Sequence, residues 1–244
     1  MDSIQKGGRV VYLGAGSSGR LGVLDAAECW PTFGSDRVVA VLAGAPASFR
    51  RSVEGVEDNP QQGVRDLGRI SFTARDLLVG ISASGRAPYV LGAMRFARRR
   101  HGKVIALTCN PQSPMAGLAD VAICPTVGPE VIAGSSRMKA GTAQKLVLNM
   151  LSTATMVRLG RVLSNKMINV QLTNQKLWTR AEGILTEFTG VSKIQAAKAL
   201  KDSHCNLPVA LMMALKKVPR SEAARRLQEG PSVAKVLRQA MEEP

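Results

Sequence analysis

The sequence predicts a three-layer α/β fold, in which a parallel sheet is flanked by helices, followed by a small C-terminal all-helical appendage. Short apolar runs alternate with helical patterns over the first part of the chain, as is typical of parallel strands joined by crossover helices. From about residue 179 no strand pattern remains, and short helical segments are separated by Gly, Pro, Ser and Asn. We therefore expect two domains, residues 1–178 and residues 179–244.

The first strand is expected at residues 9–13, where an apolar run leads directly into a glycine-rich turn, Gly14–Gly19. A helix is expected to follow over residues 18–27. A strand, a glycine-rich turn and a helix N-terminus together form an anion site, because free backbone N–H groups and the helix dipole point the same way. The hydroxyls within this turn, Ser17 and Ser18, are suited to bonding phosphate oxygens.

The same glycine spacing matches the dinucleotide fingerprint, which also requires an acid at the end of the second strand. That strand is expected at residues 38–43, and it ends in Gly44-Ala45-Pro46. The nearest acid, Asp36, precedes the strand and so lies at the opposite edge of the sheet. The context therefore favours a phosphorylated small molecule over NAD, and we expect no cofactor.

The remaining elements follow in the same alternation. After a loop rich in acids at residues 54–60, we expect strands at 76–81, 103–108 and 121–124, and helices at 87–100 and 134–159. The apolar residues of the last helix recur at helical spacing and are expected to face the core: Ala143, Leu146, Val147, Met150, Leu151 and Ala154.

Hydroxyl side chains lie beside glycine at three junctions where a strand or loop enters a helix. One such junction would be ordinary helix capping. Three junctions at comparable ends of successive units instead predict a single crevice at the carboxyl edge of the sheet, where α/β proteins bind ligands. The side chains concerned are Ser17, Ser18, Ser82, Ser84, Ser135 and Ser136, accompanied by the backbone of Gly16 and Gly85.

Composition limits the class of protein. The formal charge of +15 is consistent with solvated helix ends, such as the basic run at residues 95–103, or with an anionic substrate. Nucleic acid binding is disfavoured, because aromatic residues make up only 4% of the chain. Two histidines and four scattered cysteines argue against a metal site. Residues 1–8 lack the apolar core of a signal peptide and no apolar run could span a membrane, so we expect a cytoplasmic protein.

Three segments carry a resemblance to a known family: the first junction with the DAAEC segment that follows it, the SASGR loop at residues 82–86, and SSRMKAGTAQKLVLNMLST at residues 135–153. They resemble the sugar isomerase (SIS) domain and, more narrowly, the N-acetylmuramic acid 6-phosphate etherases. The resemblance extends from about Gly8 to the C-terminus, because the helical tail also resembles that family's small C-terminal domain. Family members carry a helical segment before the first strand, and the printed sequence begins almost at that strand.

The resemblance implies that Glu28 and Glu57 are the two catalytic carboxylates and that the hydroxyl loops and Lys139 bind the sugar phosphate. Taken alone, Glu28 would be a solvated helix residue and Glu57 a loop acid near Asn59. Expelling lactate from C3 of an opened sugar does require two such groups, one to remove the proton at C2 and one to protonate the departing oxygen. The implied products are N-acetylglucosamine 6-phosphate and D-lactate.

The resemblance also implies a homodimer with residues of both subunits near one crevice. Two alternatives remain open at this point. A non-catalytic sugar-phosphate regulator, similar to glucokinase regulatory protein, would need the crevice but neither carboxylate. A phosphosugar isomerase would use a carboxylate base at C2, but it fits the DAAEC segment less well.

Overall fold

The computed structural model describes residues 1–242 of the chain. These residues form two compact units by their internal packing. The first contains residues 1–28 and 36–152, and the second contains residues 29–35 and those from 153 onward. The boundary expected from the sequence, between residues 178 and 179, remains a prediction.

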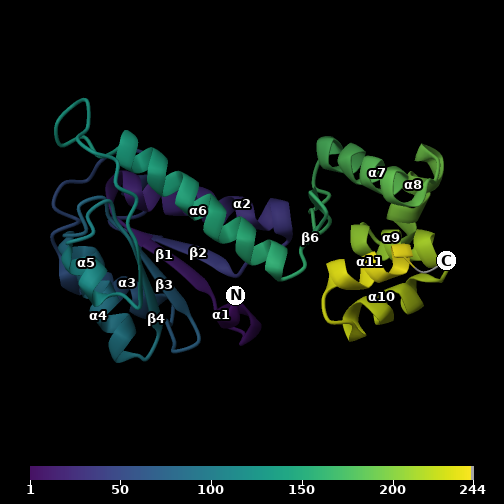
Figure 1. Ribbon diagram of the computed structural model, residues 1–244, viewed down its shortest axis with the longest axis horizontal. Coiled ribbons are helices and arrows are strands. Elements are labelled where there is room, and N and C mark those ends of the chain that lie inside the picture. Colours follow the sequence, from purple (N-terminus) through teal and green to yellow (C-terminus); the bar gives the residue numbers. More distant parts are fainter. Residues whose placement is uncertain (243–244) are drawn as a thin grey trace. The chain divides into compact units, whose positions relative to one another are not determined.

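The first unit is built on a five-stranded sheet with strand order β2-β1-β3-β4-β5, in which every neighbouring pair is parallel (Figure 1). The five residues of β1 are all buried, as expected for a central strand covered on both faces. The strands are β1 (Val10–Gly14), β2 (Val38–Leu42), β3 (Leu77–Ile81), β4 (Lys103–Leu107) and β5 (Val121–Ile123).

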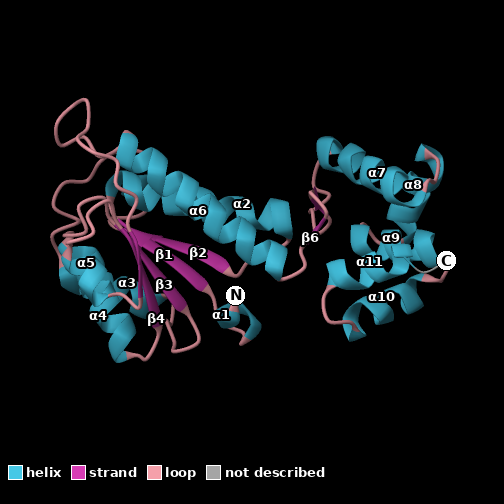
Figure 2. Cartoon of the chain, in the orientation of Figure 1, coloured by secondary structure: helices cyan, strands magenta, loops and turns pink. Residues whose placement is uncertain are grey.

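Helices cover both faces of this sheet, which confirms the predicted three-layer architecture (Figure 2). α2 and α6 lie on one face, and α3, α4 and α5 lie on the other. The helices of this part of the chain are α1 (Asp2–Gln5), α2 (Gly16–Phe33), the 3₁₀ helix η1 (Ala47–Phe49), α3 (Pro60–Arg69), α4 (Pro88–Arg99), α5 (Pro114–Leu118) and α6 (Lys139–Arg158).

The register aligns the carboxyl ends of the strands. Gly14 pairs with Ile81, Ile81 pairs with Leu107, and Leu107 pairs with Ile123. Because these four strand ends are neighbours, the loops that follow them emerge side by side at one edge of the sheet. The three junctions with hydroxyl side chains were predicted from the sequence to lie at this edge.

Four helices of this unit were not predicted from the sequence: the short α1 and η1, and α3 and α5. The last two begin with proline at the first helical position, and Asn59 and Ser113 cap them by accepting backbone N–H bonds from Gln62 and Ala116. A capping side chain followed by proline is a recognised helix start.

The predicted core face of α6 is only partly correct. Val147 is buried, but Leu146 and Met150 are 53% and 61% exposed, and Leu148 is fully buried instead. This segment is apolar on more than one side, so its periodicity does not select a single face. The helix also begins at Lys139, five residues later than the sequence predicts, because residues 134–138 form a loop.

The second unit is a helical domain with its own apolar core, to which Leu185, Leu200 and Leu211 contribute. Ser192 forms a capping box with Gln195, as its position before an Ala-rich turn suggests. Its elements are the hairpin β6 (Val162–Leu163) and β7 (Lys166–Met167), and the helices α7 (Gln175–Thr189), α8 (Lys193–Asp202), α9 (Leu207–Lys216), α10 (Arg220–Glu229) and α11 (Val233–Glu242).

Within residues 1–242, no helix combines the length and the apolar character needed to cross a bilayer.

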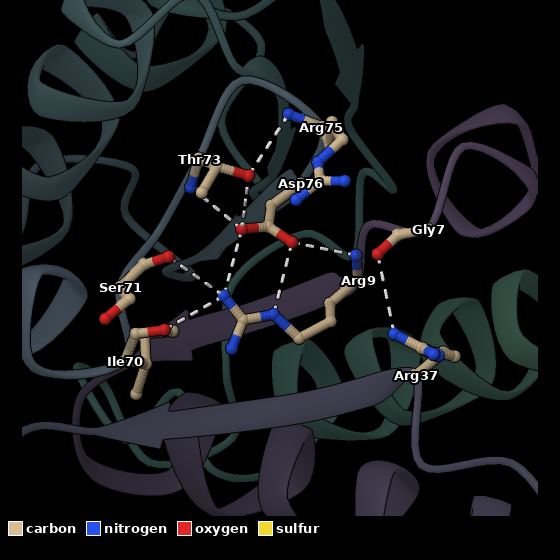
Figure 3. A network of polar contacts seen from close by, with 8 residues as sticks. All are labelled: Gly7, Arg9, Arg37, Ile70, Ser71, Thr73, Arg75 and Asp76. Atoms are coloured by element: carbon tan, nitrogen blue, oxygen red, sulfur yellow. Dashed lines mark hydrogen bonds and ion pairs between the residues drawn. The ribbon is translucent and has the colours of Figure 1, made fainter.

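A buried ion pair fixes the start of β1 against the start of β3 (Figure 3). The Arg9 guanidinium donates to both carboxylate oxygens of Asp76, at 3.2 and 3.0 Å, and the side chain of Asp76 is only 2% exposed. The backbone N–H groups of Arg9 and Thr73 also donate to this carboxylate. Burial disfavours the ionised form of Asp76, but the bonds from Arg9 and Thr73 outweigh it and hold the pKa of this carboxyl below its ordinary value.

Replacing Asp76 by Asn is expected to lower the free energy of unfolding by about 2–3 kcal/mol at pH 7, because Arg9 loses its buried partner. A lowered pKa stabilises the fold above the ordinary carboxyl pKa of about 3.9, and this contribution disappears as the pH falls through the folded-state value. The free energies of unfolding of the parent and of Asp76→Asn, measured with urea, should therefore become equal in acid. Asp36→Asn, at a 78% exposed pair with Arg37, is the control and should change stability by less than about 0.5 kcal/mol. A difference between Asp76→Asn and the parent that is independent of pH would contradict this role.

Candidate active site

A cavity of about 820 Å³ lies at the carboxyl edge of the sheet and lies wholly within the first unit. Its volume is within the range of small-molecule sites. Of the residues predicted from the sequence, those that line it are Gly16, Ser17, Ser18, Glu57, Ser82, Ser84 and Ser136. The three junctions therefore meet in one crevice, as the sequence predicts, although their contacts with a ligand remain predictions.

The glycine-rich turn brings the N-terminus of α2 to this crevice. A Cβ atom on Gly19 would collide with the backbone carbonyl of Gly14, and one on Gly14 would lie 2.9 Å from the Gly19 nitrogen. Only glycine at both positions allows α2 to start directly at the end of β1. Since the first N–H groups of a helix have no intrahelical acceptor, this end of α2 is suited to binding an anion.

The hydroxyls of the crevice differ in what they already bond. Ser18 Oγ donates to Gln144 Oε1 of α6 at 2.9 Å, whereas Ser84 Oγ accepts from the backbone N–H of Arg86 at 3.3 Å. Ser84 therefore keeps its own proton for a ligand. Gln144 is 1% exposed, and its Nε2 has no acceptor among the described residues.

Glu57 lies in the loop before α3, and its side chain is exposed at the cavity wall. Its backbone carbonyl accepts from the N–H of Tyr89 in the first turn of α4, at 2.9 Å. This bond ties the loop to the SASGR junction, so Glu57 and Ser84 line the same cavity. Asp58 and Arg86 line it as well, and the sequence patterns did not indicate them.

Glu130 is the most informative residue that the sequence patterns did not reveal. It lines the cavity, and its carboxylate accepts from the backbone N–H groups of Lys139 and Ala140, at 2.9 and 3.0 Å. The bonds from Ala140 and Lys139 lower the pKa of Glu130, so the carboxylate is ionised at neutral pH. Glu130 therefore occupies the N-terminus of α6. The N-termini of α2 and α4 also reach the crevice, since Gly16 and Pro88 line it, and α4 has no capping side chain. The position of Glu130 after β5, at the carboxyl edge, is the signal that could have identified it.

Three predicted binding residues are not part of the cavity wall. Gly85 closes its loop by donating its N–H to the Ser82 carbonyl at 3.1 Å. Ser135 N–H bonds back to the Ile132 carbonyl in the loop before α6. Gly128 lines the cavity, and a Cβ atom added to it would lie 3.8 Å from Lys139 Nζ. The ammonium group of Lys139 is therefore next to the cavity.

Glu28 does not line the cavity of its own chain. It is exposed on α2, about three turns, or roughly 16 Å, further along the helix than Ser17. The structure thus brings Glu57 together with the hydroxyl loops and leaves Glu28 apart from them. The catalytic role of both carboxylates remains a prediction.

The cavity contains no activated thiol. Burial raises the pKa of Cys109, and the nearby charges of Glu130 and Cys124 raise it further, so the thiol is neutral and a poor nucleophile. Within residues 1–242, no three His, Cys, Asp or Glu side chains lie close enough together to hold a metal ion. The groups that could act on a substrate here are carboxylates, hydroxyls and cations.

Comparison with known proteins first defines the class. The SIS domain model matches residues 65–154, and the model of the glucokinase regulatory protein N-terminal SIS domain matches residues 1–98. The C-terminal lid domain of glucokinase regulatory protein matches residues 164–205. A solved structure of a proposed phosphosugar isomerase from Bacteroides fragilis NCTC 9343 superposes with a TM-score of 0.50 at 22% identity, covering 68% of this chain and 83% of that one. The fold is therefore that of a SIS domain, as predicted.

Curated relatives define the family more narrowly. The N-acetylmuramic acid 6-phosphate etherase of Yersinia pestis (strain Pestoides F) is 51% identical over 230 residues, which cover 93% of this chain and 78% of that protein. The etherase of Yersinia pseudotuberculosis serotype O:3 (strain YPIII) matches to the same extent. The chain belongs to the N-acetylmuramic acid 6-phosphate etherase family, and the family predicted from the DAAEC and SSRMK segments is confirmed.

Replacing Gly19 by Ala is expected to lower the free energy of unfolding by about 2–3 kcal/mol, because the new methyl group meets the backbone carbonyl of Gly14. Gly68→Ala on α3 is the matched control, since a Cβ atom added there would have no neighbouring atom within 4 Å. It should leave stability unchanged or raise it by up to about 1 kcal/mol. Urea unfolding of the two variants measures the difference. Equal stability would show that the close approach of α2 to β1 is not enforced at Gly19.

Proposed function

We propose that this chain cleaves the D-lactyl ether of N-acetylmuramic acid 6-phosphate, giving N-acetylglucosamine 6-phosphate and D-lactate, in the recycling of cell-wall sugars in the cytoplasm. The observation that carries this proposal is the crevice in which a helix N-terminus, a cluster of hydroxyls and the carboxylate of Glu57 meet. Membership of the etherase family supplies the reaction.

The substrate phosphate binds at the N-terminus of α2. Backbone N–H groups and the dipole favour a dianion there, and Ser17, Ser82 and Ser84 line the adjoining wall. Glu130 neutralises the competing helix end of α6. The phosphate is remote from the bond that breaks, so its binding energy serves to orient C2 and C3 of the sugar.

Glu57 serves as the base in the reaction. With the sugar ring open, the proton at C2 is acidic because the C1 aldehyde stabilises the carbanion that forms when it leaves. Glu57 first takes this proton and leaves the carbanion. In the next step the electron pair at C2 forms the C2–C3 double bond as the C3–O bond breaks. Glu28 protonates the departing lactate oxygen. Water then adds across the double bond, its oxygen to C3 and a proton to C2, to give the product.

A homodimer resolves the separation of the two carboxylates. Glu28 lies too far along α2 to reach the crevice of its own chain, so the proposal requires that it enter the crevice of a second copy. Large apolar side chains are exposed on α2 and α6. Leu24, one turn before Glu28 on α2, is 52% exposed. Leu146 and Met150, one turn apart on α6, are 53% and 61% exposed. We assign these side chains to the apolar part of the proposed interface between the two copies.

The proposal is tested by incubating the purified protein with N-acetylmuramic acid 6-phosphate and measuring D-lactate. Glu57→Gln and Glu28→Gln should each fold normally and lose about 10²–10⁴-fold in turnover, as is usual when a general acid or base is removed. Glu54→Gln is the matched control, because Glu54 is an exposed acid of the same loop that does not line the crevice. It should retain the parent rate.

Isotope exchange separates the two roles. In deuterated water, Glu57→Gln should lose exchange of the C2 proton together with lactate release. Glu28→Gln should retain exchange while lactate release stalls, because proton removal precedes cleavage of the ether. Sugar-phosphate binding by the parent without lactate release would favour a regulator, and interconversion of phosphosugars would favour an isomerase. Either result would overturn the proposal.

Replacing Met150 by Glu should weaken the proposed dimer, because a buried, unpaired carboxylate would face the apolar side chains of the second copy. Sedimentation velocity at micromolar concentration should show a dimer for the parent and monomer for the variant, with lactate release lost in parallel. Ile194→Glu, which alters an 84% exposed side chain on α8, is the control and should remain dimeric. A fully active monomeric parent would contradict the shared site.

A further inference from the structure

Side chains of α3 and α4 line a further cavity of about 510 Å³, which is strongly basic. It is lined by Arg65 from α3 and by Arg95 and Arg99 from α4, and none of its other lining residues carries a charge. It shares no lining residue with the crevice at the carboxyl edge.

The three guanidinium groups have no protein partner among the described residues. The acid next to Arg65 in the sequence, Asp66, is already committed: it accepts from Arg69 at 2.9 Å and from the hydroxyl of Tyr89 at 2.9 Å. The other arginines at the end of α4 are engaged as well, since Arg98 donates to the Leu118 carbonyl and Arg100 lies 5.4 Å from the Phe96 ring centre.

Helix electrostatics account for Arg99 but not for the other two arginines of the cavity. A C-terminal dipole stabilises cations in the last turn of α4, such as Arg98 and Arg99. Arg95 lies before that turn, and Arg65 lies in the middle of α3. Arg95 and Arg99 are also four residues apart on one helix, a spacing at which like charges repel. An anion in the cavity would turn this repulsion into binding.

We propose that this cavity binds a small anion that carries two or more linked phosphate groups. Guanidinium groups bond phosphate oxygens in pairs, so three of them match more than one phosphate. The cavity volume is that of a small-molecule site. No aromatic ring lines the cavity, so it offers no stacking platform for the bases of a single-stranded nucleic acid.

The test is a calorimetric titration of the whole protein with tripolyphosphate, compared between variants of equal net charge. Arg95→Gln with Arg99→Gln should weaken binding by roughly tenfold or more, since bonds to charged groups are lost. Arg98→Gln with Arg100→Gln removes the same charge from the same helix outside the cavity and should change affinity by less than about fivefold. Arg65→Gln, on the other helix, should weaken binding too and serves if the double variant does not fold.

Further arms of the titration identify the source of the phosphates and the competing explanations. ATP that binds more tightly than tripolyphosphate, and that responds to the same variants, assigns the site to nucleotides; equal affinity assigns it to free polyphosphate. Equal losses in both double variants would overturn the proposal in favour of a diffuse field, and loss on Arg86→Gln would place the binding in the crevice instead. Unchanged affinity for tripolyphosphate in the Arg95/Arg99 double variant would also overturn the proposal. So would a different pattern, in which the parent does not bind tripolyphosphate but binds labelled duplex DNA, and the double variant loses that DNA binding.

Discussion

The close approach of the backbone at Gly14 and Gly19 determines where α2 begins, and the geometry of the site follows from it. Because no side chain separates these residues, the first turn of α2 lies directly at the carboxyl end of the central strand. Its free N–H groups therefore open into the same crevice as the loop after β3, whose strand end pairs with that of β1. At the opposite end of these strands, the ion pair of Arg9 with Asp76 fixes their relative position.

Because α2 starts at the crevice, Glu28, near the other end of this helix, lies away from it. A helix that starts at Gly16 advances about 1.5 Å per residue, so an acid near its far end cannot return to its start. Glu57, in contrast, is held at the cavity wall by the bond between its backbone and Tyr89. The proposed general acid, Glu28, and the proposed general base, Glu57, are thus placed far apart on one chain. A dimer whose interface includes the exposed side chains of Leu24 and Met150, as proposed above, would reconcile this placement with the proposed chemistry.

The sequence predicted the parallel sheet and the meeting of its hydroxyl loops because both depend on local patterns: apolar runs for strands, and Ser beside Gly where helices start. It failed where the outcome depends on packing. α6 is apolar on several sides, so only its packing in the folded protein decides that Leu148 is buried and Met150 is not. Glu130 was missed because its role arises from a loop that folds back onto the N-terminus of α6, nine residues later in the chain. The two carboxylates came from family resemblance, and nothing in the local pattern of either one indicates its partner.

Mixing of subunits tests the shared site most directly. Glu28→Gln and Glu57→Gln proteins, each inactive alone, would be unfolded together, refolded and assayed for D-lactate release. If each crevice combines Glu57 of one chain with Glu28 of the other, half of the dimers are mixed and one of their two crevices is intact. Activity should then return to about a quarter of the parent value, as two-fold symmetry requires. If both carboxylates act within one chain, every crevice keeps one defect, and the mixture would remain as inactive as its components.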